Sequence, residues 1–137
     1  LPSCKQSAPA RCEFRGGIES YCAAAEAMLS KKPHARFVVC EGSLTRNRAR
    51  VINAARESGF AIDRVVDVIG KAGKDPLFAV FVMRRWRSPS AATEAGDADA
   101  SRTSPPPPIH ERVLVRDASG ARTIQYRALL VTMGCPP

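Results

Sequence analysis

The spacing of apolar residues changes repeatedly along the chain, and this alternation limits the folds that the chain can adopt. An apolar stripe with helical spacing runs from Ile18 to Leu29. The short, nearly continuous run that follows, ARFVVC (35–40), is typical of a strand buried on both faces, as in a parallel sheet. Further on, one helical range (45–58) precedes two strand-like ranges (62–69 and 77–83). Helices that alternate with strands predict an α/β fold with a partly parallel sheet.

Both expected helices carry local signals for their ends. Gly16-Gly17 precede the first helix, and Lys31-Lys32-Pro33 close it with positive charge and a stop. Ser43 or Thr45 can cap the start of the second, and Gly59 stands where a C-terminal cap belongs. The core-facing residues of the second helix are expected to be Val51, Ile52, Ala54 and Ala55. Its outer face is expected to carry Arg46, Arg48, Arg50 and Arg56.

The two later strand-like ranges are separated by residues that favour turns, GKAGKDP (70–76). They are therefore expected to pair as antiparallel neighbours. A short strand is expected at Val113–Val115 and a turn at Asp117–Gly120. The apolar segment Ile124–Met133 is compatible with a helix or a strand.

Residues 87–108 differ in composition from the rest of the chain. The segment RSPSAATEAGDADASRTSPPPP has no large apolar residue and ends in four prolines. Such a segment buries too little surface to offset its ordering entropy, so we expect a disordered insertion. The expected organisation is a domain over residues 1–86, the insertion over 87–108, and an extension over 109–137 that packs back on the domain.

Length and composition restrict the functional classes. A chain of 137 residues with 45% hydrophobic content has room for one small domain with a packed core. The net charge of +8 favours a polyanionic partner such as RNA. No apolar run approaches the roughly 20 residues that span a bilayer, so no membrane partner is expected. Five widely spaced cysteines predict free thiols in a reducing, intracellular compartment, foremost the cytoplasm, with an organelle or the nucleus as alternatives.

The sequence contains no catalytic or cofactor-binding motif and no cluster with metal-ligand spacing. Cys22 and Cys40 fall within apolar patterns and are expected in the core, whereas His34 is expected at the surface. Arginines on both sides of Trp86 could hold phosphates while the indole ring stacks on a base. The candidate RNA-contacting residues are Arg11, Arg46, Arg48, Arg50, Lys71, Lys74, Arg84, Arg85 and Trp86.

Several stretches together resemble one enzyme family. ARCEFRGGIESYCAAAEAML (10–29) is similar to the region that follows the Asn-Pro-Pro-Tyr motif in the adenine-N6 tRNA methyltransferases, where Ala10, Arg11 and Glu13 match an Ala-Arg-x-Glu pattern. LFAVFVMR (77–84) resembles the last strand of the family's sheet. RVLVRDASGARTIQYRALL (112–130) resembles the family's ending, with Tyr126 at its tyrosine position. The resemblance covers about residues 10–85 and 112–130.

The resemblance implies the C-terminal half of a Rossmann-like, S-adenosylmethionine-dependent methyltransferase whose parent modifies an adenine amine in tRNA or other RNA. It places the seventh, antiparallel strand between the fifth and sixth. The family's cofactor loop and Asn-Pro-Pro-Tyr motif would lie upstream of Leu1, so this part alone is expected to be inactive and to bind no cofactor. Its exposed strand edge, at residues 35–40, would favour self-association. Two alternatives are a self-contained basic RNA-binding module and a non-catalytic partner subunit.

Overall fold

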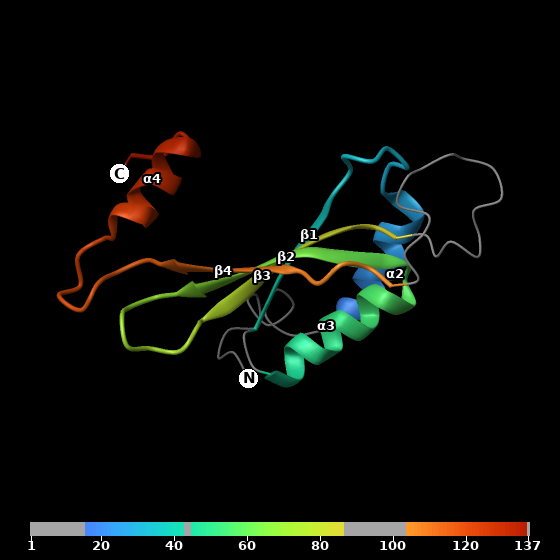
Figure 1. The fold of residues 1–137 in the computed structure, drawn as a ribbon, viewed down its shortest axis with the longest axis horizontal. Coiled ribbons are helices and arrows are strands. Elements are labelled where there is room, and N and C mark those ends of the chain that lie inside the picture. The colour runs from blue at the N-terminus through green and yellow to red at the C-terminus, as the bar shows by residue number, and fades with distance from the viewer. Residues whose placement is uncertain (1–15, 43–44, 87–103, 137) are drawn as a thin grey trace, which may run out of the picture.

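The computed structural model describes residues 16–42, 45–86 and 104–136, which form a mixed α/β structure around one four-stranded sheet (Figure 1). The helices and strands, in chain order, are α2 (Ile18–Met28), β1 (Phe37–Gly42), α3 (Thr45–Glu57), β2 (Phe60–Ile69), β3 (Phe78–Arg85), β4 (Ile109–Leu114) and α4 (Ile124–Thr132). Each of the two expected helices and four expected strands is therefore present, with ends shifted by a few residues.

The order of the strands in the sheet is β1-β3-β2-β4. β3 pairs antiparallel with β1 on one side and with β2 on the other, so β1 and β2 run in the same direction. β4 lies parallel to β2 on its far side. The antiparallel pairing of β2 with β3 is confirmed, and so is the expected position of β3 between β1 and β2.

The strand β1 differs from the expectation of a strand buried on both faces in a parallel sheet. Its only strand neighbour among the described residues is the antiparallel β3. Phe37 and Val39 pack toward the core, whereas Val38 is 53% exposed on the opposite face. Cys40 is likewise exposed, so its expected place in the core is wrong. The physical reason is that α2 and α3 cover the sheet on one side only, so alternate residues of β1 face away from them.

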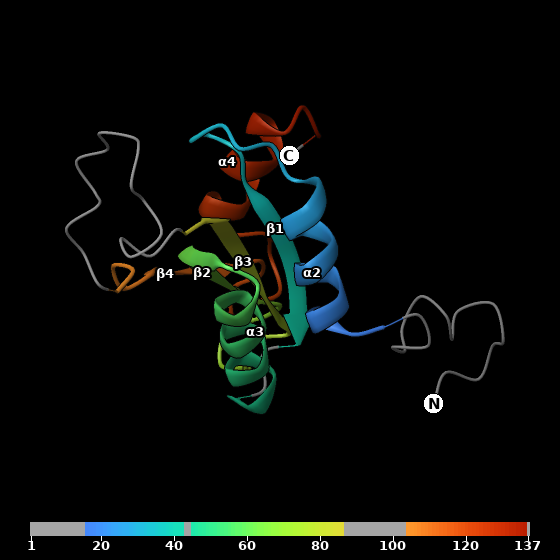
Figure 2. The same ribbon diagram turned by 90° about the vertical axis from the view of Figure 1, so that its right-hand side faces the viewer.

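The core lies between the sheet and the pair formed by α2 and α3, which lie against each other in Figures 1 and 2. Its largest fully buried side chains are Phe81, Met83, Val51 and Cys22. Val51, Ala54 and Ala55 point into the core as expected, but Ile52 is 43% exposed. Neighbouring positions on a helix are about 100° apart, so Ile52 lies at the margin of the face centred on Val51 and Ala55.

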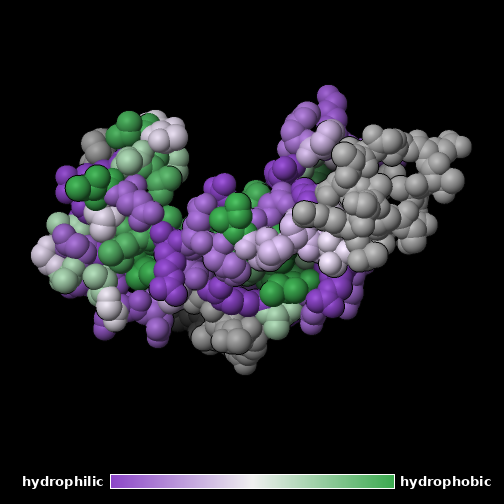
Figure 3. All heavy atoms as spheres, in the orientation of Figure 1, coloured by the Kyte–Doolittle hydropathy of each residue, from purple (hydrophilic) through white to green (hydrophobic). Residues whose placement is uncertain are grey.

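The terminal apolar segment forms a helix, α4, which settles an alternative that its sequence left open. The Thr123 side chain caps its start by accepting a hydrogen bond from the Tyr126 amide, and the same hydroxyl donates to the Leu114 carbonyl of β4. Figure 3 shows α4 as a partly hydrophobic body set apart from α2 and α3. None of its residues is buried, and Ile124 is 85% exposed.

The expected insertion at 87–108 falls mostly outside the described residues, as does Arg11. Of that segment, the structure describes 104–108, which form neither helix nor strand and lead directly into β4. The packing of β4 beside β2 brings the last part of the described chain against the earlier part.

Candidate nucleic-acid interface

Alternation along β3 separates the basic residues that surround Trp86. Arg84 and Trp86 are two positions apart, and the Arg84 guanidinium carbon lies 5.1 Å from the centroid of the Trp86 ring. Arg85 points to the opposite face of the strand, toward α2. The structure thus brings together Arg84 and Trp86 but places Arg85 elsewhere, and Arg87 lies outside the described residues.

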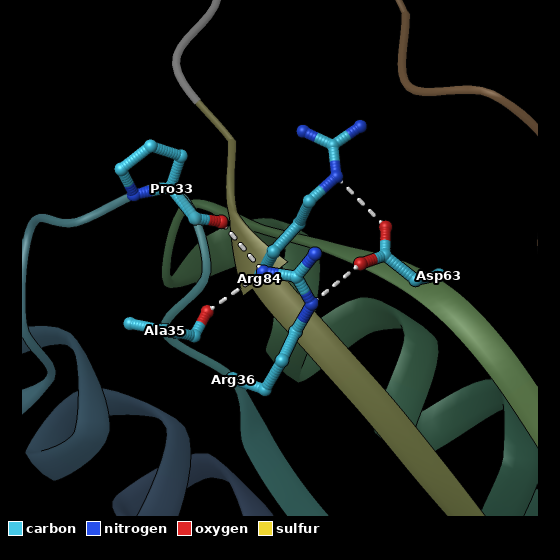
Figure 4. Close-up of polar contacts among 5 residues, drawn as sticks. All are labelled: Pro33, Ala35, Arg36, Asp63 and Arg84. Carbon is cyan, nitrogen blue, oxygen red and sulfur yellow. Dashed lines mark hydrogen bonds and ion pairs between the residues drawn. The ribbon is translucent and has the colours of Figure 1, made fainter.

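The guanidinium beside Trp86 is also held by a carboxylate. Asp63 is the extra residue of a bulge in β2, where the pairing with β3 shifts between Ile62 and Arg64. Its two carboxylate oxygens bind different arginines. Oδ1 accepts a hydrogen bond from Arg84 Nε at 2.8 Å, and Oδ2 forms an ion pair with Arg36 Nε at 3.1 Å. Arg36 also donates to the carbonyls of Pro33 and Ala35, as Figure 4 shows. This network joins the residue before β1 to β2 and β3 at one end of the sheet.

The Arg85 side chain caps the C-terminus of α2. Its guanidinium donates to the carbonyls of Glu26 and Leu29 and to the Glu26 carboxylate, which lies 3.0 Å from Nη1. The last turn of α2 contains no basic residue of its own. Because the last carbonyls of a helix lack partners within it and carry partial negative charge, a cation from β3 stabilises this end.

Two of the α3 arginines that were candidate RNA contacts, Arg48 and Arg50, also bind acidic residues. Arg48 pairs with Asp67 of β2. Arg50 donates from Nε and Nη2 to the two carboxylate oxygens of Glu19, at 2.6 and 2.7 Å. The hydrogen bond from Arg50 lowers the pKa of Glu19 below its ordinary value. Arg46 belongs to α3, but its side chain is not described, and the RNA contacts proposed for this helix stay a prediction.

Lys71 and Lys74 lie at the opposite end of the sheet, in the turn between β2 and β3. The turn is closed by the Lys74 amide, which donates to the Lys71 carbonyl at 3.1 Å. Both side chains are exposed. The Ala72 amide donates to the Arg116 carbonyl at 2.9 Å, so this turn lies directly against the turn that follows β4, as Figure 1 shows at the left of the sheet.

The second turn presents cations that are not among the RNA-contacting residues expected from the sequence. Arg116 and Arg122 face each other across an antiparallel bridge. Arg127, in the first turn of α4, donates from Nε and Nη2 to the Arg122 carbonyl at 3.1 and 3.0 Å. We refer to the exposed residues Lys71, Lys74, Arg116, Arg122 and Arg127 as the turn-end cluster.

The turn that carries Arg116 and Arg122 is held by its own hydrogen bonds. Asp117 Oδ1 accepts from the Ser119 hydroxyl at 2.6 Å and from the Ala121 amide at 3.0 Å. Gly120 adopts a φ of 94°, which favours glycine, and its carbonyl accepts from Arg116 Nη1 at 2.8 Å. The Ser119 hydroxyl and the turn amides lower the pKa of Asp117. Asp117 is thus committed to the turn.

One sequence signal could have found two of the missing cations. The Asp-Ala-Ser-Gly turn joins Arg116 to Arg122 with a spacing that suits a tight hairpin, so both arginines could have been placed opposite each other. The approach of this hairpin to Lys71 and Lys74 could not be inferred in the same way. It requires β4 to pair in parallel with β2, so that both strands end at the same side of the sheet.

A separate apolar groove of about 400 Å³ runs between α2 and β1. The residues that line it are Tyr21, Ala24, Ala25, Met28, Leu29, Phe37 and Val39. The lining has no carboxylate to bind ribose hydroxyls and no charged group to bind an amino acid, so it does not fit S-adenosylmethionine. Among the described residues, no three His, Cys, Asp or Glu side chains gather as metal ligands.

The described cysteines are unpaired thiols: Cys22 is buried, and Cys40 and Cys135 are exposed. Burial raises the pKa of the Cys22 thiol, with a further contribution from the negative charge of Glu19. Such a thiol is less reactive than an exposed one, which agrees with a packing role for Cys22. His34 is exposed, as expected.

No protein-family model matches this sequence, and no curated protein matches it. Within the described part of the chain, no helix has the length and apolar character needed to cross a membrane.

Proposed function

We propose that this chain is the C-terminal half of an S-adenosylmethionine-dependent methyltransferase that acts on an adenine amine in RNA, as in tRNA. The observation that supports the proposal is the strand order. The resemblance implies two parallel strands with a later antiparallel strand inserted between them, and β1, β2 and β3 have this arrangement. The helices α2 and α3 occupy the positions in the chain that the resemblance implies, before β1 and between β1 and β2.

In this proposal the chain contributes a rigid half of the sheet and a basic surface, not the reacting groups. The cofactor loop and the residues that hold the target amine would come from polypeptide upstream of Leu1. Binding would bring the amine nitrogen and the methyl carbon together and exclude water from them, which are general sources of rate enhancement.

The test is methyl transfer by the product of the complete reading frame. RNA would be incubated with S-adenosylmethionine labelled in its methyl group, and N6-methyladenosine would be measured after digestion to nucleosides. We expect labelled N6-methyladenosine with the complete product and none with residues 1–137 alone. A complete product without a glycine-rich loop and an Asn-Pro-Pro-Tyr motif, and without transfer, would contradict the proposal.

Titration calorimetry adds a test on the chain itself. Residues 1–137 are expected to show no measurable heat of binding with S-adenosylmethionine, because neither the groove beside α2 nor any sequence motif provides its polar contacts. Micromolar binding would contradict the division into a cofactor-binding half and this half.

A second candidate is a self-contained RNA-binding module. The observation that favours it is the turn-end cluster, which belongs wholly to this chain. Methyl transfer by the complete product distinguishes the two, because a module of this kind would bind RNA and leave its adenines unmodified.

A further inference from the structure

Arg116 and Arg122 form a pair of like charges in the turn that follows β4. The two residues lie opposite each other in an antiparallel bridge. Like charges in directly opposite positions destabilise a pair of strands unless something offsets their repulsion. Within the described ranges, no carboxylate lies at ion-pair distance from either guanidinium.

The surroundings add positive charge to this pair. Lys71 and Lys74 lie on the adjoining turn, which is joined to Arg116 by the amide of Ala72. The acidic residues of the two turns are Asp75 and Asp117, and Asp117 is engaged with Ser119 and Ala121. Five exposed cations therefore lie beside two carboxylates. Asp117 is engaged within its own turn, and Asp75 is exposed to solvent.

The position in the fold suits a ligand site. β2 and β4 are parallel, and both end beside the turn-end cluster, at Ile69 and Leu114. Because the two strands end at the same side of the sheet, the turns that follow them lie side by side and bring their cations together. Backbone hydrogen bonds join the two turns: the Ala72 amide donates to the Arg116 carbonyl, and the Val115 amide donates to the Ile69 carbonyl, both at 2.9 Å.

We infer that the turn-end cluster binds the phosphate backbone of RNA. Arg116 and Arg122 flank a phosphate and donate to its oxygens, while Lys71 and Lys74 neutralise neighbouring phosphates along the strand. The contacts are to phosphate, so the cluster positions the RNA and leaves recognition of its bases to other residues. This inference rests on the proposed RNA substrate.

The test compares RNA binding by matched variants of the whole chain. A fluorescein-labelled RNA stem-loop is titrated with protein, and the dissociation constant is obtained from fluorescence anisotropy. Two double variants remove cations from the cluster, K71Q/K74Q and R116Q/R122Q. The control is K31Q/K32Q, which removes the same charge from two exposed lysines between α2 and β1. Circular dichroism before titration shows that each variant is folded.

Each cluster variant is expected to weaken binding by about 10-fold or more, because two phosphate contacts are lost, and the control by less than about 2-fold. Equal losses in all three variants would show binding to net charge alone and overturn the inference. Binding to vesicles of phosphatidylserine and phosphatidylcholine, with none to RNA, would overturn it as well.

The RNA-binding test of the cluster and the methyl-transfer test of the proposed function can fail independently. If the cluster variants lose RNA binding and the complete gene product transfers no methyl group, the cluster stands and the methyltransferase proposal fails. If the complete product methylates RNA while both cluster variants bind it unchanged, the methyltransferase proposal stands and the cluster inference fails.

Discussion

The two ends of the sheet carry cations in different environments. Where β3 ends, Arg84 and Arg36 share Asp63, and Arg85 binds the last carbonyls of α2. Where β2 and β4 end, the turn-end cluster has no described carboxylate at ion-pair distance. The difference shows that a run of basic residues in a sequence does not by itself identify a binding surface. Cations that pair with the protein's own carboxylates stabilise the fold, whereas cations without a described carboxylate partner are open to an anionic ligand.

The largest expected effect is on stability, at the end that contains Arg85. Arg85→Ala removes the contacts to the carbonyls of Glu26 and Leu29 and the pairing with the Glu26 carboxylate. We expect the free energy of unfolding to fall by about 2 kcal/mol, the range for hydrogen bonds that involve a charged group. Urea denaturation followed by circular dichroism measures it. An unchanged midpoint of urea denaturation would show that the contacts of Arg85 with α2 do not stabilise the protein.

Asp63→Asn should have a smaller effect at the same end. The amide keeps one acceptor oxygen but loses the charge that both Arg36 and Arg84 approach. Because the three side chains are 23–38% exposed, solvent screens the interaction, and we expect a loss of about 1 kcal/mol. The matched change at the other end, Lys71→Ala, should alter stability by less than about 0.5 kcal/mol. Similar losses in both variants would remove the distinction between the two ends.

The salt dependence of RNA binding should change only when the turn-end cluster is altered. Each cation that contacts a phosphate contributes about one unit to the slope of the logarithm of the binding constant against the logarithm of salt concentration. K71Q/K74Q should therefore reduce the slope by about two units, and K31Q/K32Q should leave it unchanged. Anisotropy titrations over a series of potassium chloride concentrations provide the slopes, and equal slopes for both variants would argue against localised contacts.

Local patterns in the sequence were sufficient to predict much of the fold. Helical spacing located α2 and α3, and turn residues between apolar runs identified the β2–β3 hairpin. The placement of β3 between β1 and β2 came from the family resemblance, because apolar spacing alone does not determine strand order. Burial was less predictable. Val38 and Cys40 are apolar but exposed on the face of the sheet that the helices leave uncovered. Which face the helices cover depends on how the chain crosses from one strand to the next, so the sequence of β1 alone does not indicate it.

The candidate site was predictable only in part. The alternation of side chains along a strand separates Arg84 and Trp86 from Arg85, and this could have been inferred from the sequence. The acid that binds Arg84 could not, because Asp63 reaches it from a bulge in another strand. The turn-end cluster likewise combines residues more than 40 positions apart, and no local pattern connects Lys71 with Arg116.

The smallest expected effect concerns the turn that holds Arg116 and Arg122. Hydrogen bonds from the Ser119 hydroxyl and from the amides of Ala121, Gly120 and Ser119 favour ionised Asp117 and lower its pKa in the folded chain. The stabilisation that Asp117 provides is thus fully present above its pKa in the unfolded chain and is lost as the pH falls through its folded pKa. The Ala121 amide resonance, followed by NMR during acidification, should titrate at a lower pH than the same amide in an unstructured peptide of this turn. Asp117→Asn keeps an acceptor oxygen without a titrating group, so this acidic transition should disappear. A midpoint equal to that of the peptide would show that the turn is not held by Asp117, and the fixed opposition of Arg116 and Arg122 would then lose its support.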